Sequence, residues 1–219
     1  MSDNAIAGGP VAVFGGTFDP VHHGHLRSGV ELAERLQFAE VRMMPCGSPP
    51  HRESPERSAM HRAAMLELAV APDPMLHCDR RELLRGGRSY TVDSLIELRQ
   101  ELGEKRSICL VMGCDAVLDI TSWHRWEELL HLAHVVVIAR PGWQIPESGP
   151  VAQWMRSNST TGAQQLSALS AGTVHVEELR PFAVSASEIR KLLAAGKSAR
   201  YLLPESVLEY ISNHELYTH

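Results

Sequence analysis

The fold is decided by residues 11–26, which read VAVFGGTFDPVHHGHL. The four apolar residues from Val11 to Phe14 predict a buried strand. The two glycines that follow predict a turn in which the backbone can approach a phosphate closely. The amphipathic run from His23 to Gln37 predicts a helix, and the start of a helix favours an anion. Strand, turn and helix together predict a phosphate-binding site.

Two histidines at the start of that helix are candidates to contact the phosphate. His22 and His25 are three positions apart and therefore share one face of a helical turn. An imidazole can donate a hydrogen bond to a phosphoryl oxygen, and it adds positive charge when it is protonated. A metal site is the alternative, although no Asp, Glu or Cys follows at a matching spacing on the same helix.

Length and composition exclude several classes of protein. The 219 residues fit one domain, with residues 1–9 expected to form a flexible tail and residues 180–219 a C-terminal helical part. A formal net charge of −5 argues against a nucleic-acid-coating protein. No apolar run approaches ~18 residues, so we expect no membrane span. Without an export signal or a C-x-x-C pair, the four cysteines are expected to be buried thiols of a cytoplasmic protein.

Apolar runs alternate with amphipathic segments along the whole chain. Such continuous apolar runs are typical of parallel strands buried on both faces. We therefore expect an α/β fold, with a Rossmann-like, mostly parallel sheet and helices on both faces. Residues 143–172 show no strong periodicity and are expected to form an excursion with one short helix near 151–155. Strands are predicted at 11–14, 41–45, 75–78, 107–112, 134–139 and 173–177, and helices at 23–37, 58–69, 92–101, 121–130, 187–193 and 204–211.

Polar and aromatic residues stand where several of these elements begin or end. Asp115 follows a strand, where α/β sheets hold ligands; it suits ribose hydroxyls, and capping the next helix is the alternative. Thr91 is expected to cap a helix, or else to contact a ligand together with Tyr90. Trp123 could stack on a planar ligand or pack in the core.

Two further groups are candidates to bind phosphate. Ser185, Ser187 and Arg190 offer two hydroxyls and a guanidinium fork, and the alternative is a helix capped by Ser187 with a surface arginine. His51 and Arg52 lie in a loop rich in Pro and Ser, where a solvated pair of charges is the alternative.

The string GGTFDPVHHGHL resembles the signature of the H-x-G-H nucleotidyltransferases. Further motifs narrow the resemblance to the bacterial nicotinate-nucleotide adenylyltransferase family, whose order they follow over nearly the whole chain. The resemblance implies transfer of AMP from ATP to nicotinate mononucleotide, giving deamido-NAD and pyrophosphate, with Mg²⁺ bound to the ATP phosphates. The motifs are PPHR at 49–52, MLELA at 65–69, SYT at 89–91, GCD at 113–115, WHRWEELL at 123–130, ARPG at 139–142 and SASEIR at 185–190.

The resemblance also implies a role for each matching residue. ATP and nicotinate mononucleotide are the implied partners, with no nucleic acid and no membrane; an oligomer is compatible, and no protein ligand is assigned to Mg²⁺. Val184 and Ala186 depart from the usual Ile and Ser of the late motif, and Arg52 stands where many relatives carry Lys. The implied catalytic residues are His22, His25 and Arg190; the ATP-binding residues are Gly15, Gly16, Thr17, Phe18, His22, His25, Gly113, Asp115, Ser185, Ser187 and Arg190; the residues for nicotinate mononucleotide are His51, Arg52, Tyr90, Thr91 and Trp123.

Other functions share part of this pattern. A pantetheine-phosphate adenylyltransferase or a cytidylyltransferase would share the region around the H-x-G-H motif but should lack the SYT and WHRW motifs. A nucleotide-binding regulator that has lost catalysis would be expected to lack some of the catalytic residues. A metal-binding module would use only the histidine cluster.

Overall fold

A computed structural model describes residues 8–47, 57–160 and 162–218 of the chain. Within these ranges the strands are β1 (Val11–Gly16), β2 (Glu40–Pro45), β3 (Leu76–Cys78), β4 (Ile108–Gly113), β5 (His134–Ala139), β6 (Ser159–Thr160) and β7 (Val174–Glu178). The α-helices are α1 (His23–Leu36), α2 (Ala59–Val70), α3 (Arg81–Arg85), α4 (Thr91–Leu102), α5 (Cys114–Leu118), α6 (Leu129–Leu132), α7 (Pro150–Ser157), α8 (Ala163–Ala168), α9 (Ala186–Ala194) and α10 (Glu205–Asn213). Two 3₁₀-helices, η1 (Ile120–Ser122) and η2 (Trp126–Glu128), complete the set in these ranges.

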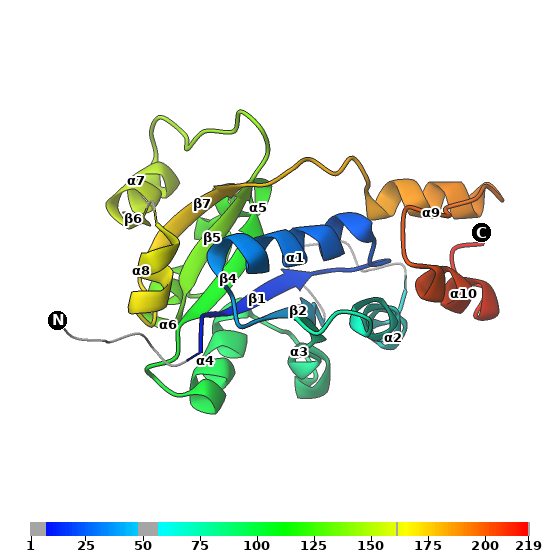
Figure 1. The fold of residues 1–219 in the computed structure, drawn as a ribbon, viewed down its shortest axis with the longest axis horizontal. Coiled ribbons are helices and arrows are strands. Elements are labelled where there is room, and N and C mark those ends of the chain that lie inside the picture. Colours follow the sequence, from blue (N-terminus) through cyan, green and yellow to red (C-terminus); the bar gives the residue numbers. More distant parts are fainter. Residues whose placement is uncertain (1–7, 48–56, 161, 219) are drawn as a thin grey trace. The chain divides into compact units, whose positions relative to one another are not determined.

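The described strands form one sheet in the order β3-β2-β1-β4-β5-β7-β6 (Figure 1). The pairs β1–β4, β4–β5, β5–β7 and β6–β7 are all parallel. Parallel neighbours need a crossover, and helices supply the crossovers between these strands. The structure thus confirms the predicted α/β, Rossmann-like sheet with helices around it.

The central residues of β4 and β5, the two most continuous apolar runs, belong to the buried core. Ile108 to Val111 and Val135 to Val137 are each at most 4% exposed. Burying one such side chain fully stabilises a fold by about 1.5–3 kcal/mol, so these two strands anchor the sheet. This burial on both faces is the reason that the sequence shows unbroken apolar runs there.

The six predicted strands agree with the structure to within two residues, whereas two other predictions need correction. The short helix predicted near 151–155 is confirmed as α7, but the excursion at 143–172 also contains β6 and α8. The predicted helix over 121–130 is interrupted, because Trp123 is extended and Arg125 has the left-handed φ of 53°.

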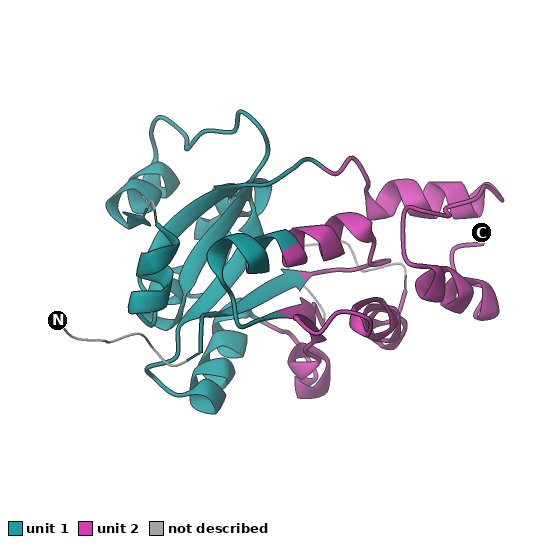
Figure 2. Cartoon of the chain, in the orientation of Figure 1, with its two compact units in different colours: residues 1–15, 31–41, 90–181 teal, residues 16–30, 42–89, 182–219 magenta. Residues whose placement is uncertain are grey.

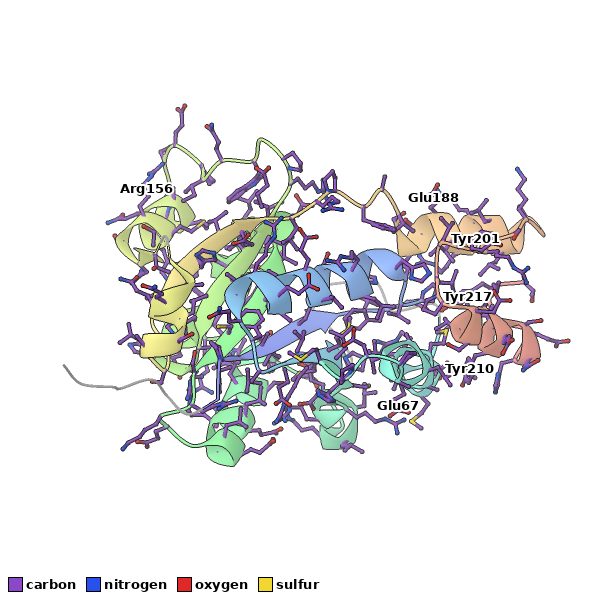
Figure 3. All side chains as sticks on the ribbon, viewed as in Figure 1. Glu67, Arg156, Glu188, Tyr201, Tyr210 and Tyr217 are labelled. Atoms are coloured by element: carbon purple, nitrogen blue, oxygen red, sulfur yellow. The ribbon has the colours of Figure 1, made fainter. Side chains whose placement is uncertain are left out.

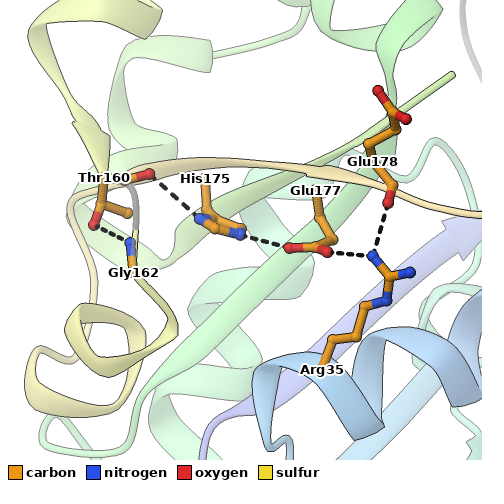
Figure 4. A network of polar contacts seen from close by, with 6 residues as sticks. All are labelled: Arg35, Thr160, Gly162, His175, Glu177 and Glu178. Atoms are coloured by element: carbon orange, nitrogen blue, oxygen red, sulfur yellow. Dashed lines mark hydrogen bonds and ion pairs between the residues drawn. The ribbon is translucent and has the colours of Figure 1, made fainter. Parts of the chain in front are cut away.

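A polar network attaches the last turn of α1 to β7 (Figure 4). Arg35 donates to the Glu177 carboxylate at 2.8 Å and to the Glu178 carbonyl at 2.9 Å. Glu177 also contacts His175 at 2.9 Å, and His175 in turn lies 3.3 Å from the Thr160 carbonyl. The basic residue near the C-terminus of α1 also complements the helix dipole.

Two compact units can be distinguished in the chain (Figure 2). Unit 1 comprises residues 1–15, 31–41 and 90–181, and unit 2 comprises residues 16–30, 42–89 and 182–219. The expectation that residues 1–219 form one domain stays a prediction, as does the expected tail, most of which lies outside the described residues.

The remaining predictions from composition concern membranes and thiols. No described helix combines the length and the apolar character that a membrane span requires. All four cysteines are free; Cys109 and Cys114 are buried, whereas Cys46 and Cys78 are half-buried. Burial raises the pKa of both Cys78 and Cys109 to about 12, so these two thiols stay protonated at neutral pH.

Candidate active site

The loop between β1 and α1 differs from the predicted glycine turn. Gly15 and Gly16 are the last residues of β1, and neither has a positive φ. The left-handed residue is Phe18, with a φ of 49°. A Cβ on Gly16 would lie 2.8 Å from Cζ of the buried Phe18 ring, so the ring requires a glycine there. By contrast, a Cβ on Gly15 would meet no described atom within 4 Å, which leaves that backbone open to a close approach.

His22 and His25 share one face of the first turn, as their spacing predicts. Their rings stack with centroids 3.7 Å apart and planes inclined by 22°. The Phe18 ring meets His25 edge-on at 5.0 Å. The turn itself is closed by backbone bonds from the amides of His25 and Leu26 to the His22 carbonyl, at 3.0 and 3.3 Å. The two imidazoles are therefore held by packing as well as by the helix.

Both imidazoles are uncharged at neutral pH. Burial, and then the charge of His23, lowers the pKa of His22 to about 4. Burial, and then His22, lowers the pKa of His25 to about 3. The His22 backbone amide donates to Nδ1 of His25 at 3.3 Å, so a neutral His25 carries its proton on Nε2. Nδ1 of His22 is buried and has no hydrogen-bond partner among the described residues.

Sterics explain why position 24, in the H-x-G-H motif, is a glycine. A Cβ at this position would lie 2.9 Å from Cγ1 of Val184 and 3.1 Å from Nδ1 and Cε1 of the His22 ring. Any side chain here would displace either His22 or the segment that leads into α9. The glycine of the motif therefore leaves the space that the His22 ring needs to pack.

The start of α9 brings Ser185, Ser187 and Arg190 together, with one change from the prediction. Ser185 caps the helix by accepting from the Glu188 amide at 3.2 Å, so the prediction that Ser187 is the cap is wrong. The two hydroxyls are exposed and lie 3.2 Å apart. Arg190 donates from Nη1 to the Asp19 carbonyl at 2.9 Å, which attaches it to the β1–α1 loop. The structure thus brings the late motif to the loop that carries the histidines.

Arg62 holds the same loop, and the motifs did not single it out. This residue of α2 is only 1% exposed. Its guanidinium donates to the carbonyls of Thr17 and Cys46 at 2.8 Å and of Gly47 at 3.2 Å, so it joins the segments that follow β1 and β2. Helical periodicity was a usable signal, because Arg62 lies three, four and seven positions before the buried Met65, Leu66 and Ala69.

In unit 1, Asp115 lies just beyond β4, as predicted, but it caps no helix. Gly113 is the N-cap residue of α5, and Asp115 lies in the first turn. Its carboxylate pairs with Arg140 at 2.8 Å, and the two side chains are 73% and 76% exposed. An exposed pair of this kind contributes at most about 1 kcal/mol, so the carboxylate remains accessible to another partner. A Cβ on Gly113 would meet no described atom within 4 Å.

Tyr90, Thr91 and Trp123 are all half-buried residues of unit 1. Tyr90 is the N-cap residue of α4 and Thr91 the first helical residue, so the prediction that Thr91 caps the helix is wrong. The Tyr90 ring lies 4.4 Å from the ring of His124, a residue of the WHRW motif with no predicted role. Trp123 is extended between η1 and η2.

Arg125 ties the Trp123 segment to α4. Its guanidinium meets the Glu128 carboxylate with two bonds of 2.8 and 2.6 Å, and it lies 3.6 Å from the Asp93 carboxylate. Asp93 belongs to the first turn of α4, which Thr91 begins. The WHRW motif therefore contains its own anchor, an arginine in the left-handed conformation between the two tryptophans.

The described residues do not test the roles predicted for His51 and Arg52, and they bear on the alternative of a metal site only within their own ranges. His51 and Arg52 lie outside the described residues. Among the described residues, no group of three or more His, Cys, Asp or Glu side chains is arranged to hold a metal ion.

The comparisons with known proteins agree with one another. Residues 13–192 match the family model described as cytidylyltransferase-like. The chain is 45% identical over 209 residues to the "Probable nicotinate-nucleotide adenylyltransferase" of Hahella chejuensis, covering 95% of each chain. It is 46% identical over 207 residues to the protein of the same name from Cellvibrio japonicus, covering 94% of this chain and 98% of that one.

The fold also resembles a solved structure at low sequence identity. This is the Plasmodium falciparum nicotinic acid mononucleotide adenylyltransferase complexed with NaAD, at a TM-score of 0.69 and 17% identity, covering 95% of this chain and 97% of that one. Motifs, fold, family model and full-length relatives all agree, and the chain belongs to the nicotinate-nucleotide adenylyltransferase family.

Proposed function

We propose that the protein transfers AMP from ATP to nicotinate mononucleotide, giving deamido-NAD and pyrophosphate in NAD biosynthesis. The observation that carries the chemistry is the stacked pair His22 and His25 at the start of α1, directly after the loop to which Arg190 is hydrogen-bonded. These three residues combine directed hydrogen-bond donors with one permanent positive charge, which is what a transferring phosphoryl group needs. The full-length relatives that bear this activity in their names support the choice of substrates.

In the proposed reaction, an oxygen of the acceptor's 5′-phosphate attacks the α-phosphorus of ATP. The new oxygen–phosphorus bond forms as the bond from the α-phosphorus to the bridging oxygen of pyrophosphate breaks, in line with the attack. No covalent intermediate with the protein is needed, so catalysis consists of positioning and charge stabilisation. We assign His25 the role of a hydrogen-bond donor through Nε2, because its Nδ1 accepts from the backbone.

The other triphosphate contacts are assigned to the same part of the chain. Arg190 supplies the positive charge, since both histidines are neutral at pH 7. The exposed hydroxyls of Ser185 and Ser187 would donate to phosphate oxygens. Gly15, Gly16, Thr17 and Phe18 would offer the backbone along which the phosphates lie.

The nucleoside and pyridine contacts are assigned to residues of unit 1. Gly113 and Asp115 would meet the adenosine, with Asp115 exchanging its exposed partner Arg140 for ribose hydroxyls. Tyr90 and Thr91 would frame the pyridine ring and its carboxylate, and Trp123 would stack on the ring. His51 and Arg52 would reach the phosphate of the mononucleotide.

We propose that Mg²⁺ enters with ATP and stays bound mainly to phosphates and water. When bound, it would neutralise charge on the phosphates. The described residues offer no cluster of metal ligands, so we assign no protein ligand and derive no step through the ion. We also place the protein in the cytoplasm, a proposal that the four free thiols support.

The test is pyrophosphate release from ATP and Mg²⁺ with three acceptors in parallel: nicotinate mononucleotide, nicotinamide mononucleotide and phosphopantetheine. We expect rapid release with the first, accompanied by deamido-NAD on chromatography. Release only with phosphopantetheine would identify a different adenylyltransferase. If none of the three acceptors gives pyrophosphate release although the protein binds ATP tightly, the protein is a regulator without catalysis.

A further inference from the structure

The end of the chain folds back after α10 into a turn that is unfavourable for its residues. Glu215 and Tyr217 have left-handed φ values of 50° and 63°. The amide of Leu216 donates to the Ile211 carbonyl at 3.0 Å, which closes a turn at the end of α10. Left-handed backbone is disfavoured for residues other than glycine, so buried contacts must hold this turn. Leu216 and Tyr217 are indeed 6% and 1% exposed.

Tyr217 makes a specific polar contact at its buried end. Its hydroxyl donates to Oδ1 of Asp19 at 2.5 Å, and Asp19 itself is only 3% exposed. Burial, and then this bond, raises the pKa of Tyr217, so the phenol stays protonated and remains a donor. The guanidinium carbon of Arg57 lies 4.8 Å from the centre of the ring. Figure 3 labels Tyr217 beside α10, together with Tyr210 and Tyr201.

Asp19 links this contact to the candidate active site. Its side chain accepts from Tyr217, and its backbone carbonyl accepts from Nη1 of Arg190 at 2.9 Å. Asp19 also lies three residues before His22 in the β1–α1 loop. One buried residue therefore connects the chain terminus, the arginine of α9 and the loop that carries the histidines, all within unit 2.

We propose that Tyr217 is a positioning residue for ATP: through Asp19 it holds the β1–α1 loop and Arg190 in the geometry that binds the triphosphate. The inference rests on the proposed function, because it assigns Arg190 and the loop to ATP. Tyr217 touches no substrate in this scheme. Its contribution is to fix Asp19, whose carbonyl sets the position of the guanidinium.

The first test is Tyr217→Phe, which removes one oxygen and keeps the buried ring. We expect the KM for ATP to rise on the order of tenfold, as for the loss of a hydrogen bond to a charged group, while the KM for nicotinate mononucleotide stays within about twofold. Tyr210→Phe is the matched control, because it removes the hydroxyl of another unit 2 tyrosine, which lies 3.0 Å from His61. The control should leave both KM values unchanged. A folded Tyr217→Phe enzyme with an unchanged KM for ATP overturns the proposal.

A double-mutant cycle with Arg190→Ala separates positioning from general stability. If Tyr217 acts through Arg190, the Arg190→Ala change should weaken ATP binding less in the Tyr217→Phe background than in the wild type. The binding of a non-hydrolysable ATP analogue, measured by calorimetry, gives this result without turnover. If the two substitutions instead weaken ATP binding independently, so that their effects on the Kd multiply, the proposal is overturned. A merely structural role of Tyr217 predicts that result.

Hydrogen exchange of the wild-type chain tests the same coupling without any variant that must fold. If the terminal turn positions the ATP site, then ATP must in turn stabilise the terminal turn, because coupling is reciprocal. We expect the ATP analogue to slow exchange in a peptide covering residues 211–218. Slower exchange around His22 and His25 with no change in that peptide would overturn the proposal. Failure of the wild type to form deamido-NAD would instead refute the proposed function, and the exchange result would still decide the coupling.

Discussion

Many of the candidate site residues lie in two segments, one around the β1–α1 loop and one from the end of β4 onward, and the two segments are held in different ways. The β1–α1 loop of unit 2 is fixed by buried groups: Arg62, Asp19 and Tyr217 are each at most 3% exposed. The residues beyond β4 in unit 1 are held by exposed ion pairs, such as Asp115 with Arg140 and Arg125 with Glu128. Buried hydrogen bonds resist rearrangement, whereas exposed ion pairs open readily in water.

This difference matches the chemistry proposed for each loop. Stabilising a phosphoryl transfer needs donors fixed in advance within a fraction of an ångström. Binding a nucleoside and a pyridine ring tolerates adjustment, because stacking and ribose contacts can form as the ligand arrives. Asp115 illustrates the second case, since its present partner is a solvent-exposed arginine that a ribose hydroxyl can replace.

The largest expected effect is on catalysis, from a change in the first turn of α1. His25→Ala should lower kcat by on the order of 100- to 1,000-fold, or about 2.7–4 kcal/mol, the usual effect of losing one preorganised donor. The melting temperature should change little. His23→Ala, which removes the half-buried neighbouring histidine, is the matched control and should retain most of the turnover. An equal loss of turnover and of folding in His25→Ala would assign the ring a packing role.

The next largest effect is expected on the pH dependence of stability, and it comes from His22 and His25. Both have folded-state pKa values below the ordinary value, at about 4 for His22 and about 3 for His25. The unfolded chain therefore binds more protons between pH 6.5 and 4, and stability falls as the pH falls through that window. We expect His22→Asn/His25→Asn to lose less stability than the wild type between pH 7 and pH 4, by a few kcal/mol. Urea denaturation at each pH measures this, and parallel losses in the two proteins would contradict the assignment.

A smaller effect is expected on stability from Arg62. Arg62→Met removes the guanidinium that satisfies the carbonyls of Thr17, Cys46 and Gly47. We expect the free energy of unfolding to fall by about 2–4 kcal/mol, because buried carbonyls would lose their donors. Urea denaturation at neutral pH measures the change. A loss below about 0.5 kcal/mol would mean that water replaces the guanidinium and that the loop is not fixed by burial.

The smallest effect is expected from the exposed ion pair in unit 1. Arg140→Ala removes the exposed partner of Asp115, and we expect it to change the free energy of unfolding by less than about 0.5 kcal/mol. The KM for ATP should stay the same or fall slightly, since the Asp115 carboxylate no longer has to exchange a partner. A marked loss of stability would show that this surface ion pair stabilises the fold as much as the buried contacts of the β1–α1 loop do.

Much of this could be predicted from residue patterns of short range. The apolar runs of β4 and β5 identified the sheet because strands buried on both faces require them. The spacing of His22 and His25 placed both rings on one helical face, and the structure confirms their contact. Local patterns failed where one conformation competed with another, as at the Ser185 cap and at the left-handed Arg125 that interrupts the predicted helix over 121–130.

The sequence by itself determined the fold class, the family and the residues assigned to the phosphates, because the order of strands and helices and the contiguous motifs depend on local spacing. Only the tertiary structure decided what holds those residues. Arg62 and Tyr217 are far apart in the chain and lie in none of the motifs, and Asp19 lies in the GGTFDPVHHGHL string without a role assigned from it. Their importance comes from burial and from hydrogen bonds that span up to 198 positions. Such bonds depend on the packing of whole elements, which residue spacing does not encode.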